Sequence, residues 1–255
     1  MNSHPLLFIV TSLHGTFAAR HSLPLSARQA WRSGVFALLD TALDRNDAVL
    51  ADVAAVLADA IGDGKTVYAF GAGHSISLVN EMYHRAGSFK AMQPIWNTEL
   101  TARGPGIDED ALGTLENTAG YYREFTDGLT WGPGDVCWVV SNSGRNALVV
   151  ELAQEAKRNG VTVIALTSVP HSTAVPPTPG LPRLLDIADY LLDNCGRVGD
   201  ASLEVEGVAE PMAPTSTIVG ATLIHAAWAG AAELLAGAGK PPEVWASANR
   251  GPAAS

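Results

Sequence analysis

Two short polar loops in the sequence carry side chains that are able to bind an anion. "FGAGHS" ends in Ser75, and "VSNSGRN" contains Ser141, Ser143 and Asn146. Each loop follows an apolar, strand-like run and precedes a helix-like run, so each places hydroxyl groups at the first turn of a helix. Helix N-termini present unpaired backbone N–H groups and a partial positive charge. The two loops therefore predict a phosphate-binding site.

The complete predicted binding set includes the glycines and neighbours of both loops and two residues further along the chain. Its members are Gly73, Ser75, Ser141, Asn142, Ser143, Gly144, Arg145, Asn146, Ser168 and Asp200. Ser168 opens a long loop, and Asp200 lies in the glycine-rich turn "GRVGDAS". The alternatives are ordinary N-caps for the serines and plain turn chemistry for Asp200. Two loops at the carboxyl ends of strands favour binding, because ligands of open α/β sheets bind there.

Glu81 is the first of four candidates for acid/base chemistry. It follows Ser75 by six residues, and His84 and Arg85 follow it at i+3 and i+4 on the same predicted helix face. Moving a proton from a carbon beside a carbonyl requires a base of suitable pKa and a group that polarises the oxygen. The alternative for this cluster is a surface salt bridge.

Glu99, His225 and His74 are the other three candidates. Glu99, in "WNTEL", follows the expected second strand; the alternative is a carboxylate that stabilises a helix start. His225 interrupts the apolar C-terminal helix, where a histidine is otherwise a core or interface residue. His74 lies beside the predicted phosphate, where it would bind a substrate oxygen or act as a ring-opening acid, unless it faces solvent.

Two glycine-rich segments resemble nucleotide-binding motifs but lack required residues. "GDGKT" is preceded by Asp59 where a P-loop needs its first glycine, and "GAGHSI" has Ile76 at the third glycine of a dinucleotide fingerprint. The 7 histidines show no H-x-x-x-H or Cys/His spacing typical of a metal site. We therefore expect no cofactor and no metal.

Short β-branched runs alternate with helix-like runs through the chain. The strand-like runs are "TVYAF", "DVCWVV" and "VTVIALT", with further short ones at 188–194 and 202–207. Helical spacing extends over 35–61, which predicts one or two helices, and over 76–86, 115–125, 147–159 and about 216–236. The alternation predicts a doubly wound α/β fold with a mostly parallel sheet. Segments 101–110 and 168–183 are expected to be long loops.

The composition excludes several classes of protein. The chain has 255 residues and a formal net charge of -10, with no Lys/Arg cluster, so we expect no nucleic-acid partner. No apolar run approaches the roughly 18 residues that span a bilayer, so we expect no membrane association. The only cysteines, Cys137 and Cys195, occur singly in apolar runs. Free thiols are typical of a reducing compartment, so a cytoplasmic protein is expected.

The order strand, "GAGHS", helix, strand, "SNSG", helix, then "GVTVIALTS" resembles the sugar isomerase (SIS) domain family over roughly residues 35–235. With "HRAGS" and "GDASLEVEG...APTSTIVGA", the chain is most similar to the UPF0309 group of phosphoheptose-isomerase-like proteins. The resemblance implies a three-layer α/β/α sandwich, a phosphorylated sugar as ligand, and a homodimer or homotetramer. It places Ser75, Ser141 and Ser143 on phosphate-binding positions. Residues 31–250 are expected to form one such domain after an N-terminal tail, 1–30, of uncertain order.

The resemblance implies an isomerase that interconverts aldose and ketose sugar phosphates through an enediol. The alternatives are a non-catalytic phosphosugar sensor, a sugar-phosphate lyase or etherase, and a purely structural oligomer. Arg145 and Asn146 stand where many members have Glu and Thr, and Arg145 either adds charge to the site or lies in solvent. Glu81 stands where zinc-binding phosphoheptose isomerases have a histidine, and Arg85 stands where etherase relatives have a catalytic glutamate.

Overall fold

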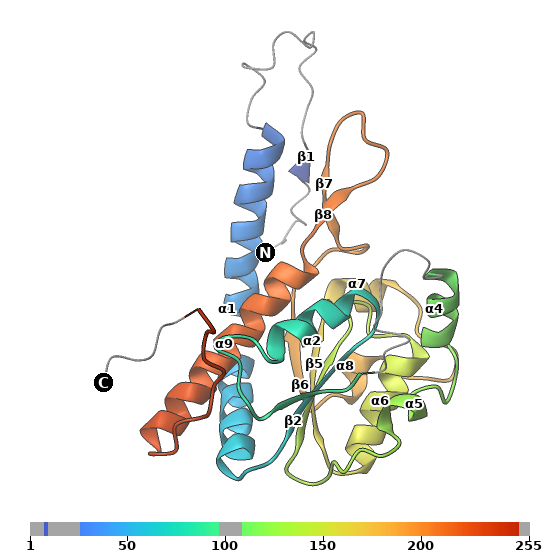
Figure 1. The fold of residues 1–255 in the computed structure, drawn as a ribbon. Coiled ribbons are helices and arrows are strands. Elements are labelled where there is room, and N and C mark those ends of the chain that lie inside the picture. Colours follow the sequence, from blue (N-terminus) through green and yellow to red (C-terminus); the bar gives the residue numbers. More distant parts are fainter. Residues whose placement is uncertain (1–7, 10–25, 97–108, 250–255) are drawn as a thin grey trace.

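A five-stranded parallel sheet forms the centre of the computed structural model, which describes residues 8–9, 26–96 and 109–249 (Figure 1). Its strands lie in the order β3-β2-β4-β5-β6, and each neighbouring pair is parallel. They are β2 (Val67–Gly71), β3 (Met92–Pro94), β4 (Val136–Val140), β5 (Thr162–Thr167) and β6 (Tyr190–Asp193). β2 and β4 are buried along their whole length, which explains their uninterrupted apolar sequences.

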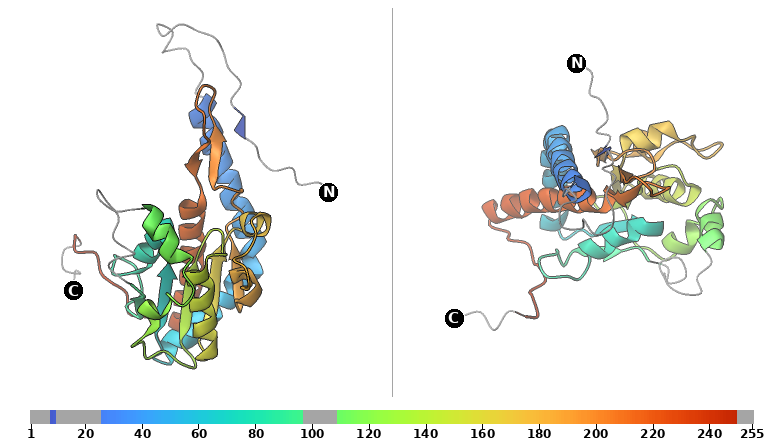
Figure 2. Two further views of the ribbon diagram at one scale, coloured as in Figure 1. Left: turned by 90° about the vertical axis from the view of Figure 1, so that its right-hand side faces the viewer. Right: turned by 90° about the horizontal axis from the view of Figure 1, so that it is seen from above.

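Helices cover both faces of this sheet, which confirms the three-layer α/β/α sandwich (Figure 2). One face packs against α1 (Ser26–Gly62), α2 (Ile76–Met82) and α9 (Ser216–Gly237). The other packs against α4 (Glu109–Glu116), α5 (Arg123–Thr126), α6 (Ala147–Arg158) and α8 (Leu184–Ile187). Successive residues of a strand serve opposite faces: Trp138 belongs to the first core and Val139 to the second.

The order of the strands creates a point where the direction of winding changes. From β2 the chain goes to the edge strand β3, and it then returns to β4 on the other side of β2. The loops that follow β2 and β4 therefore begin side by side but lead into helices on opposite faces, α2 and α6. Ligands of open α/β sheets bind at such a switch point.

Several element boundaries differ from the sequence expectations. The run 35–61 is part of one helix, α1, which starts at Ser26 and so takes in the end of the expected tail. α2 ends at Met82, because Tyr83 is extended and His84 has a φ of 48°. The run 115–125 is divided between α4 and α5 by a turn. The expected loop 168–183 contains α7 (Val169–Ala174), whose first turn is capped by Ser168.

α9 corrects the expectation that no run of the chain reaches membrane-spanning length. It has 22 residues, and by length and composition alone it is long and apolar enough to span a bilayer. However, Val219, Leu223, Ala227 and Trp228 are buried in the core, where α9 packs against α1. The core helix of a folded domain passes the same test of length and composition.

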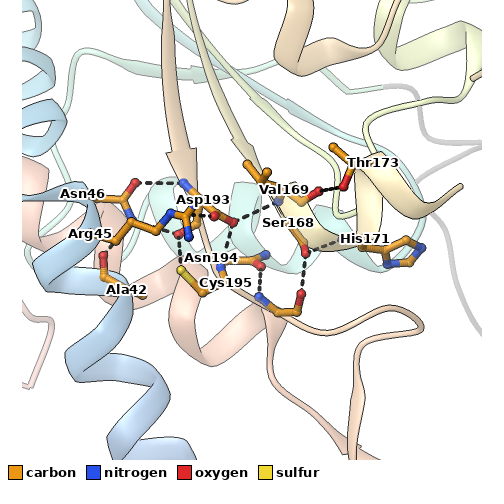
Figure 3. Close-up of polar contacts among 11 residues, drawn as sticks. Ala42, Arg45, Asn46, Ser168, Val169, His171, Thr173, Asp193, Asn194 and Cys195 are labelled. Atoms are coloured by element: carbon orange, nitrogen blue, oxygen red, sulfur yellow. Dashed lines mark hydrogen bonds and ion pairs between the residues drawn. The ribbon is translucent and has the colours of Figure 1, made fainter. Parts of the chain in front are cut away.

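The middle of α1 is hydrogen-bonded to the outer edge of β6 (Figure 3). Asn46 is 2% exposed; its Nδ2 donates to the Asp193 carbonyl oxygen at 2.8 Å, and its Oδ1 accepts from the Asp193 N–H at 2.9 Å. Arg45 adds an ion pair to the Asp193 carboxylate at 3.1 Å. Beyond β6, a small second sheet pairs β7 (Ala201–Glu204) in parallel with β1 (Phe8–Ile9) and antiparallel with β8 (Met212–Pro214).

Candidate functional site

The first loop carries the chain from β2 into α2 through a tight 3₁₀ turn, Gly73–Ser75. A Cβ atom at Gly71 would lie 2.8 Å from the Ser75 carbonyl oxygen, so the turn requires glycine there. Ser75 is half-buried and His74 is exposed. Neither side chain has a hydrogen-bond partner among the described residues. Both groups are therefore available to a ligand.

The second loop is held by its own hydrogen bonds. The Gly144 N–H donates to Ser141 Oγ at 3.1 Å, and Gly144 takes a φ of 58°. The Asn142 amide contacts Asn194 at 2.9 Å on one side and His171 at 3.2 Å on the other. This loop is consequently fixed in shape before any ligand binds.

The start of α6 completes the second loop. Asn146 Nδ2 donates to Glu116 Oε2 at 3.0 Å, so its amide is turned toward α4 and makes no capping bond to α6. Ser143 is half-buried and has no hydrogen-bond partner among the described residues. The uncapped N–H groups of α6 and the Ser143 hydroxyl therefore keep their hydrogen-bonding capacity for an anion.

A cleft of about 300 Å³ lies between the two loops at the switch point of the sheet. It brings together most of the predicted binding residues and one predicted acid/base residue. Those that line it are Gly73, His74, Ser75, Ser141, Asn142, Ser143, Asn146 and Asp200. The sequence interpretation missed five polar lining residues: Glu116, His171, Asn194, Ser216 and Thr217.

Three predicted binding residues lie beside the cleft rather than along its described lining. Gly144 is buried, and its carbonyl accepts from the Leu184 N–H. Arg145 donates from Nη1 to the Pro176 carbonyl oxygen at 3.1 Å, an exposed hydrogen bond outside the described lining of the cleft. Ser168 is fully buried; its Oγ donates to the Gly196 carbonyl oxygen and accepts from the His171 N–H.

Asp200 lines the cleft, but its oxygens serve α9. Oδ1 accepts from the backbone N–H groups of Thr215 and Ser216 at 3.0 and 2.9 Å, and Oδ2 accepts from the Ser216 hydroxyl at 2.6 Å. A carboxylate at a helix N-terminus stabilises the helix through these bonds and through the helix dipole. Asp200, which has a φ of 67°, therefore positions the first turn of α9 at the cleft.

Glu81 and His225 meet on the α2–α9 side of the sheet, outside the described lining of the cleft. His225 Nε2 lies 2.8 Å from Glu81 Oε1, and Arg85 pairs with Glu81 Oε2. Burial raises the pKa of the Glu81 carboxyl, but the hydrogen bonds from His225 and Arg85 outweigh it, so the pKa lies below the ordinary value of 4.5. The carboxylate form is thus the stable one at neutral pH. Glu99, the remaining acid/base candidate, lies outside the described residues.

The cleft holds no lysine or arginine among its described lining residues. Its titratable groups are His74, His171, Glu116 and Asp200. Burial lowers the pKa of His171, with Asp200 opposing this effect and Arg145 adding to it. An anion in this cleft would be bound by hydroxyls, amides and the N-terminal N–H groups of α6 rather than by a fixed positive side chain.

Fold and site together define an α/β protein with a ligand-binding cleft at the switch point of a parallel sheet. The model of the family described as SIS domain matches residues 30–168. A UPF0309 protein of Shouchella clausii is 33% identical over 226 residues, which are 88% of this chain and 91% of the relative. One of Brucella canis is 37% identical over 215 residues, 84% of this chain and 86% of the relative. The chain therefore belongs to the SIS domain family, in its UPF0309 group.

Solved structures share the fold. The phosphoheptose isomerase GmhA of Neisseria gonorrhoeae superposes with a TM-score of 0.50 at 20% identity, covering 81% of this chain and 97% of that chain. A phosphoheptose isomerase of Francisella tularensis gives a TM-score of 0.51 at 14% identity, covering 83% and 99% of the two chains. At these identities the likeness establishes the architecture.

Proposed function

We propose that the cleft binds the phosphate group of a phosphorylated sugar. The observation that carries the proposal is the convergence of the hydroxyls of Ser75 and Ser143 with the uncapped N-terminus of α6 in one cleft. Such groups bind phosphate without a lysine or arginine. Membership of the SIS domain family and the likeness to two phosphoheptose isomerases support a sugar as the rest of the ligand.

The proposed reaction is the interconversion of an aldose and a ketose phosphate. Glu81 lies on α2, the helix that begins directly after Ser75, although outside the described lining of the cleft. In this proposal Glu81 removes the proton from the carbon next to the carbonyl and returns it to the former carbonyl carbon, while a proton passes from the adjacent hydroxyl oxygen to the carbonyl oxygen. His225 orients the carboxylate, and His74 opens the sugar ring from the cleft. Glu99 is the alternative base.

The two hydrogen bonds to Glu81 support this role and also limit it. They keep the carboxylate deprotonated and in one orientation, which a general base requires. They also lower its pKa and therefore its strength as a base. We expect the sugar to displace Arg85 from the carboxylate while His225 keeps its hydrogen bond, which would restore part of the basicity of Glu81 in the complex.

The first test is a thermal-shift panel of sugar phosphates against their unphosphorylated parents. A ligand that binds only the folded state raises the melting temperature. We expect phosphorylated sugars to stabilise the protein, Ser143→Ala to abolish the shift, and Ser77→Ala to retain it, since Ser77 is exposed on α2 outside the described lining. A panel in which no sugar phosphate shifts the wild type would overturn the proposal.

The second test separates an isomerase from a non-catalytic sensor. The sensor is favoured by one observation, that Glu81 and His225 lie outside the described lining of the cleft. For the ligand found in the panel, an isomerase loses aldose–ketose turnover in Glu81→Gln while keeping its affinity. The matched control is Glu233→Gln, which changes an exposed carboxylate on α9. Binding by the wild type without turnover would identify a sensor.

Location and assembly are part of the same proposal. We propose a cytoplasmic protein that forms homodimers or homotetramers and binds neither nucleic acid nor membranes. Both cysteines are free thiols, which suits a reducing compartment. Phe36 on α1 and Ile218 and Leu234 on α9 are exposed apolar side chains that suit contacts between subunits. Light scattering coupled to gel filtration tests the assembly, and a monomeric mass at micromolar concentration would exclude it.

A further inference from the structure

A line of side-chain hydrogen bonds runs from the backbone of Gly196 to the ring of His171 behind the second loop. The Gly196 N–H lies 2.9 Å from Asn194 Oδ1, and Asn194 Nδ2 lies 2.9 Å from Asn142 Oδ1. Asn142 Nδ2 in turn lies 3.2 Å from His171 Nδ1. We call these three side chains, Asn194, Asn142 and His171, the amide relay.

The chemistry of the first donor fixes the direction of every bond in the amide relay. A backbone N–H only donates, so the Asn194 atom that it meets is the carbonyl oxygen, and the NH₂ group of Asn194 faces Asn142. By the same reasoning the Asn142 oxygen accepts, and its NH₂ group faces His171. His171 Nδ1 must then offer a lone pair, which leaves the ring proton on Nε2.

The segments that carry the amide relay are held together by further hydrogen bonds (Figure 3). The Ser168 hydroxyl joins the Gly196 carbonyl oxygen, at 2.6 Å, to the His171 N–H, at 3.1 Å. Asp193 Oδ1 accepts from the N–H groups of Val169 and Cys195, each at 2.9 Å. The start of α7, which carries His171, is therefore fixed against the chain that follows β6.

We infer that the amide relay holds His171 as a neutral imidazole that donates its Nε2–H to a phosphate oxygen of the ligand in the cleft. His171 lines the cleft, and the described residues offer no other partner for its ring. Its link to Asn142, between Ser141 and Ser143, places it at the phosphate end of the proposed site. The ligand role rests on the proposed function; the tautomer does not.

The surroundings of His171 favour the neutral ring. Burial and the positive charge of Arg145 lower its pKa, and the charge of Asp200 opposes them. A protonated ring would carry hydrogen on both nitrogens and would turn a donor toward the Asn142 NH₂ group. That clash of donors would have to be relieved by turning the Asn142 amide, which Asn194 holds in place.

The tautomer is measured without any ligand. In two-bond ¹H–¹⁵N correlation spectra at pH 7.5, the His171 ring, assigned by its loss in His171→Gln, is expected to show the Nε2–H pattern. Asn194→Leu removes the group that orients Asn142, and a mixture of tautomers is expected if thermal melting shows that the variant is folded. An Nδ1–H pattern or a doubly protonated ring in the wild type would overturn the inference.

Two substitutions at His171 distinguish two roles of its ring: donating a hydrogen bond to the ligand, or only supporting the Asn142 side chain. Glutamine places an amide NH₂ group near the position of Nε2, whereas asparagine keeps an acceptor near Nδ1 but does not reach the cleft. Inorganic phosphate and fructose 6-phosphate are titrated by calorimetry. We expect His171→Gln to retain the affinity within about threefold and His171→Asn to lose about tenfold or more, the effect of one hydrogen bond to a charged group.

The outcomes distinguish this inference from the proposed function. If His171→Asn binds both probes like the wild type while His171→Gln does not, His171 supports Asn142 and donates nothing to the ligand. If only fructose 6-phosphate loses affinity, Nε2 contacts the sugar and the assignment to phosphate is wrong. If the wild type binds neither probe, the ligand role fails, while the spectra still decide the tautomer. His84→Asn, outside the described lining, is the control for histidine loss.

Discussion

The two serine loops are alike in sequence but differ in how their side chains are held. In the second loop, the Ser141 hydroxyl bonds to the Gly144 N–H, and Asn142 is fixed from both sides. In the first loop, neither the Ser75 hydroxyl nor the His74 ring has a partner among the described residues. The second loop is thus a preformed wall of the cleft with the Ser143 hydroxyl left to the ligand, whereas in the first loop both side chains are left to it. Similar sequence motifs after neighbouring strands therefore have different structural roles.

The largest expected effect concerns the backbone of the second loop. At Gly144, φ is 58°, and an added Cβ would lie 3.2 Å from both Leu184 Cβ and Thr167 Oγ1. Strain and overpacking together are expected to lower the free energy of unfolding of Gly144→Ala by about 2–4 kcal/mol. Gly64→Ala is the control, since Gly64 has a φ of 70° but open space around it. If urea denaturation shows that Gly144→Ala and Gly64→Ala lose the same free energy of unfolding, the second loop is not tightly packed.

The next effect compares one hydroxyl from each loop. Ser141→Ala leaves the Gly144 N–H without its partner in a buried position, which is expected to cost about 1–3 kcal/mol in the free energy of unfolding. Ser75→Ala is expected to change it by less than about 0.5 kcal/mol, because no described group loses a bond. Urea denaturation of both variants tests this contrast. A destabilised Ser75→Ala would show that the first loop is also preformed.

A smaller effect on stability is expected at acidic pH. It arises from His171, whose ring contacts Asn142 of the second loop. The folded protein holds the pKa of His171 below its ordinary value of 6.5, so the folded state binds fewer protons than the unfolded chain as the pH falls below about 6.5. Stability from this source is therefore complete above that pH and declines toward pH 5. Melting temperatures measured from pH 8 to 5 should fall more in the wild type than in His171→Gln. Parallel curves would contradict the expectation.

The smallest effect is expected at Arg145, the one arginine in either loop. Its side chain bonds to the Pro176 carbonyl oxygen, away from the cleft. Arg145→Ala should therefore change the affinity for inorganic phosphate by less than about twofold, given that exposed charges contribute little. Calorimetry at low and at moderate salt tests this. A tenfold loss of affinity for phosphate at both salt concentrations would show that Arg145 turns toward the anion in the complex.

The sequence was sufficient for the sheet and for the two loops. β2, β4 and β5 are short, apolar and β-branched, and a doubly wound order places the loops after β2 and β4 at one edge. The helix ends were less predictable. α2 stops at Met82 because of backbone angles at Tyr83 and His84, which periodicity does not report.

The site residues contributed by distant segments were not predictable. His171 and Asn194 reach the second loop from 29 and 52 residues away, and His225 meets Glu81 across 144 residues. Local spacing carries no information on such contacts. The one available signal for His171 was its place in the expected long loop 168–183, since such loops often carry function. For Arg145 and Ser168 the sequence was misleading in the opposite way. Their positions suggested a ligand contact, but their side chains bond to the carbonyl oxygens of Pro176 and Gly196.

The bonds between Asn46 and Asp193 also bear on how the protein avoids aggregation. β6 is an outer strand of the central sheet, and such a strand exposes backbone groups that pair readily with a strand of another molecule. At Asp193 the Asn46 amide takes both backbone positions that a foreign strand would use. With α1 packed along β6, the helix acts as a cover for this edge. Replacing Asn46 is therefore expected to increase self-association during refolding before it causes any change in the cleft.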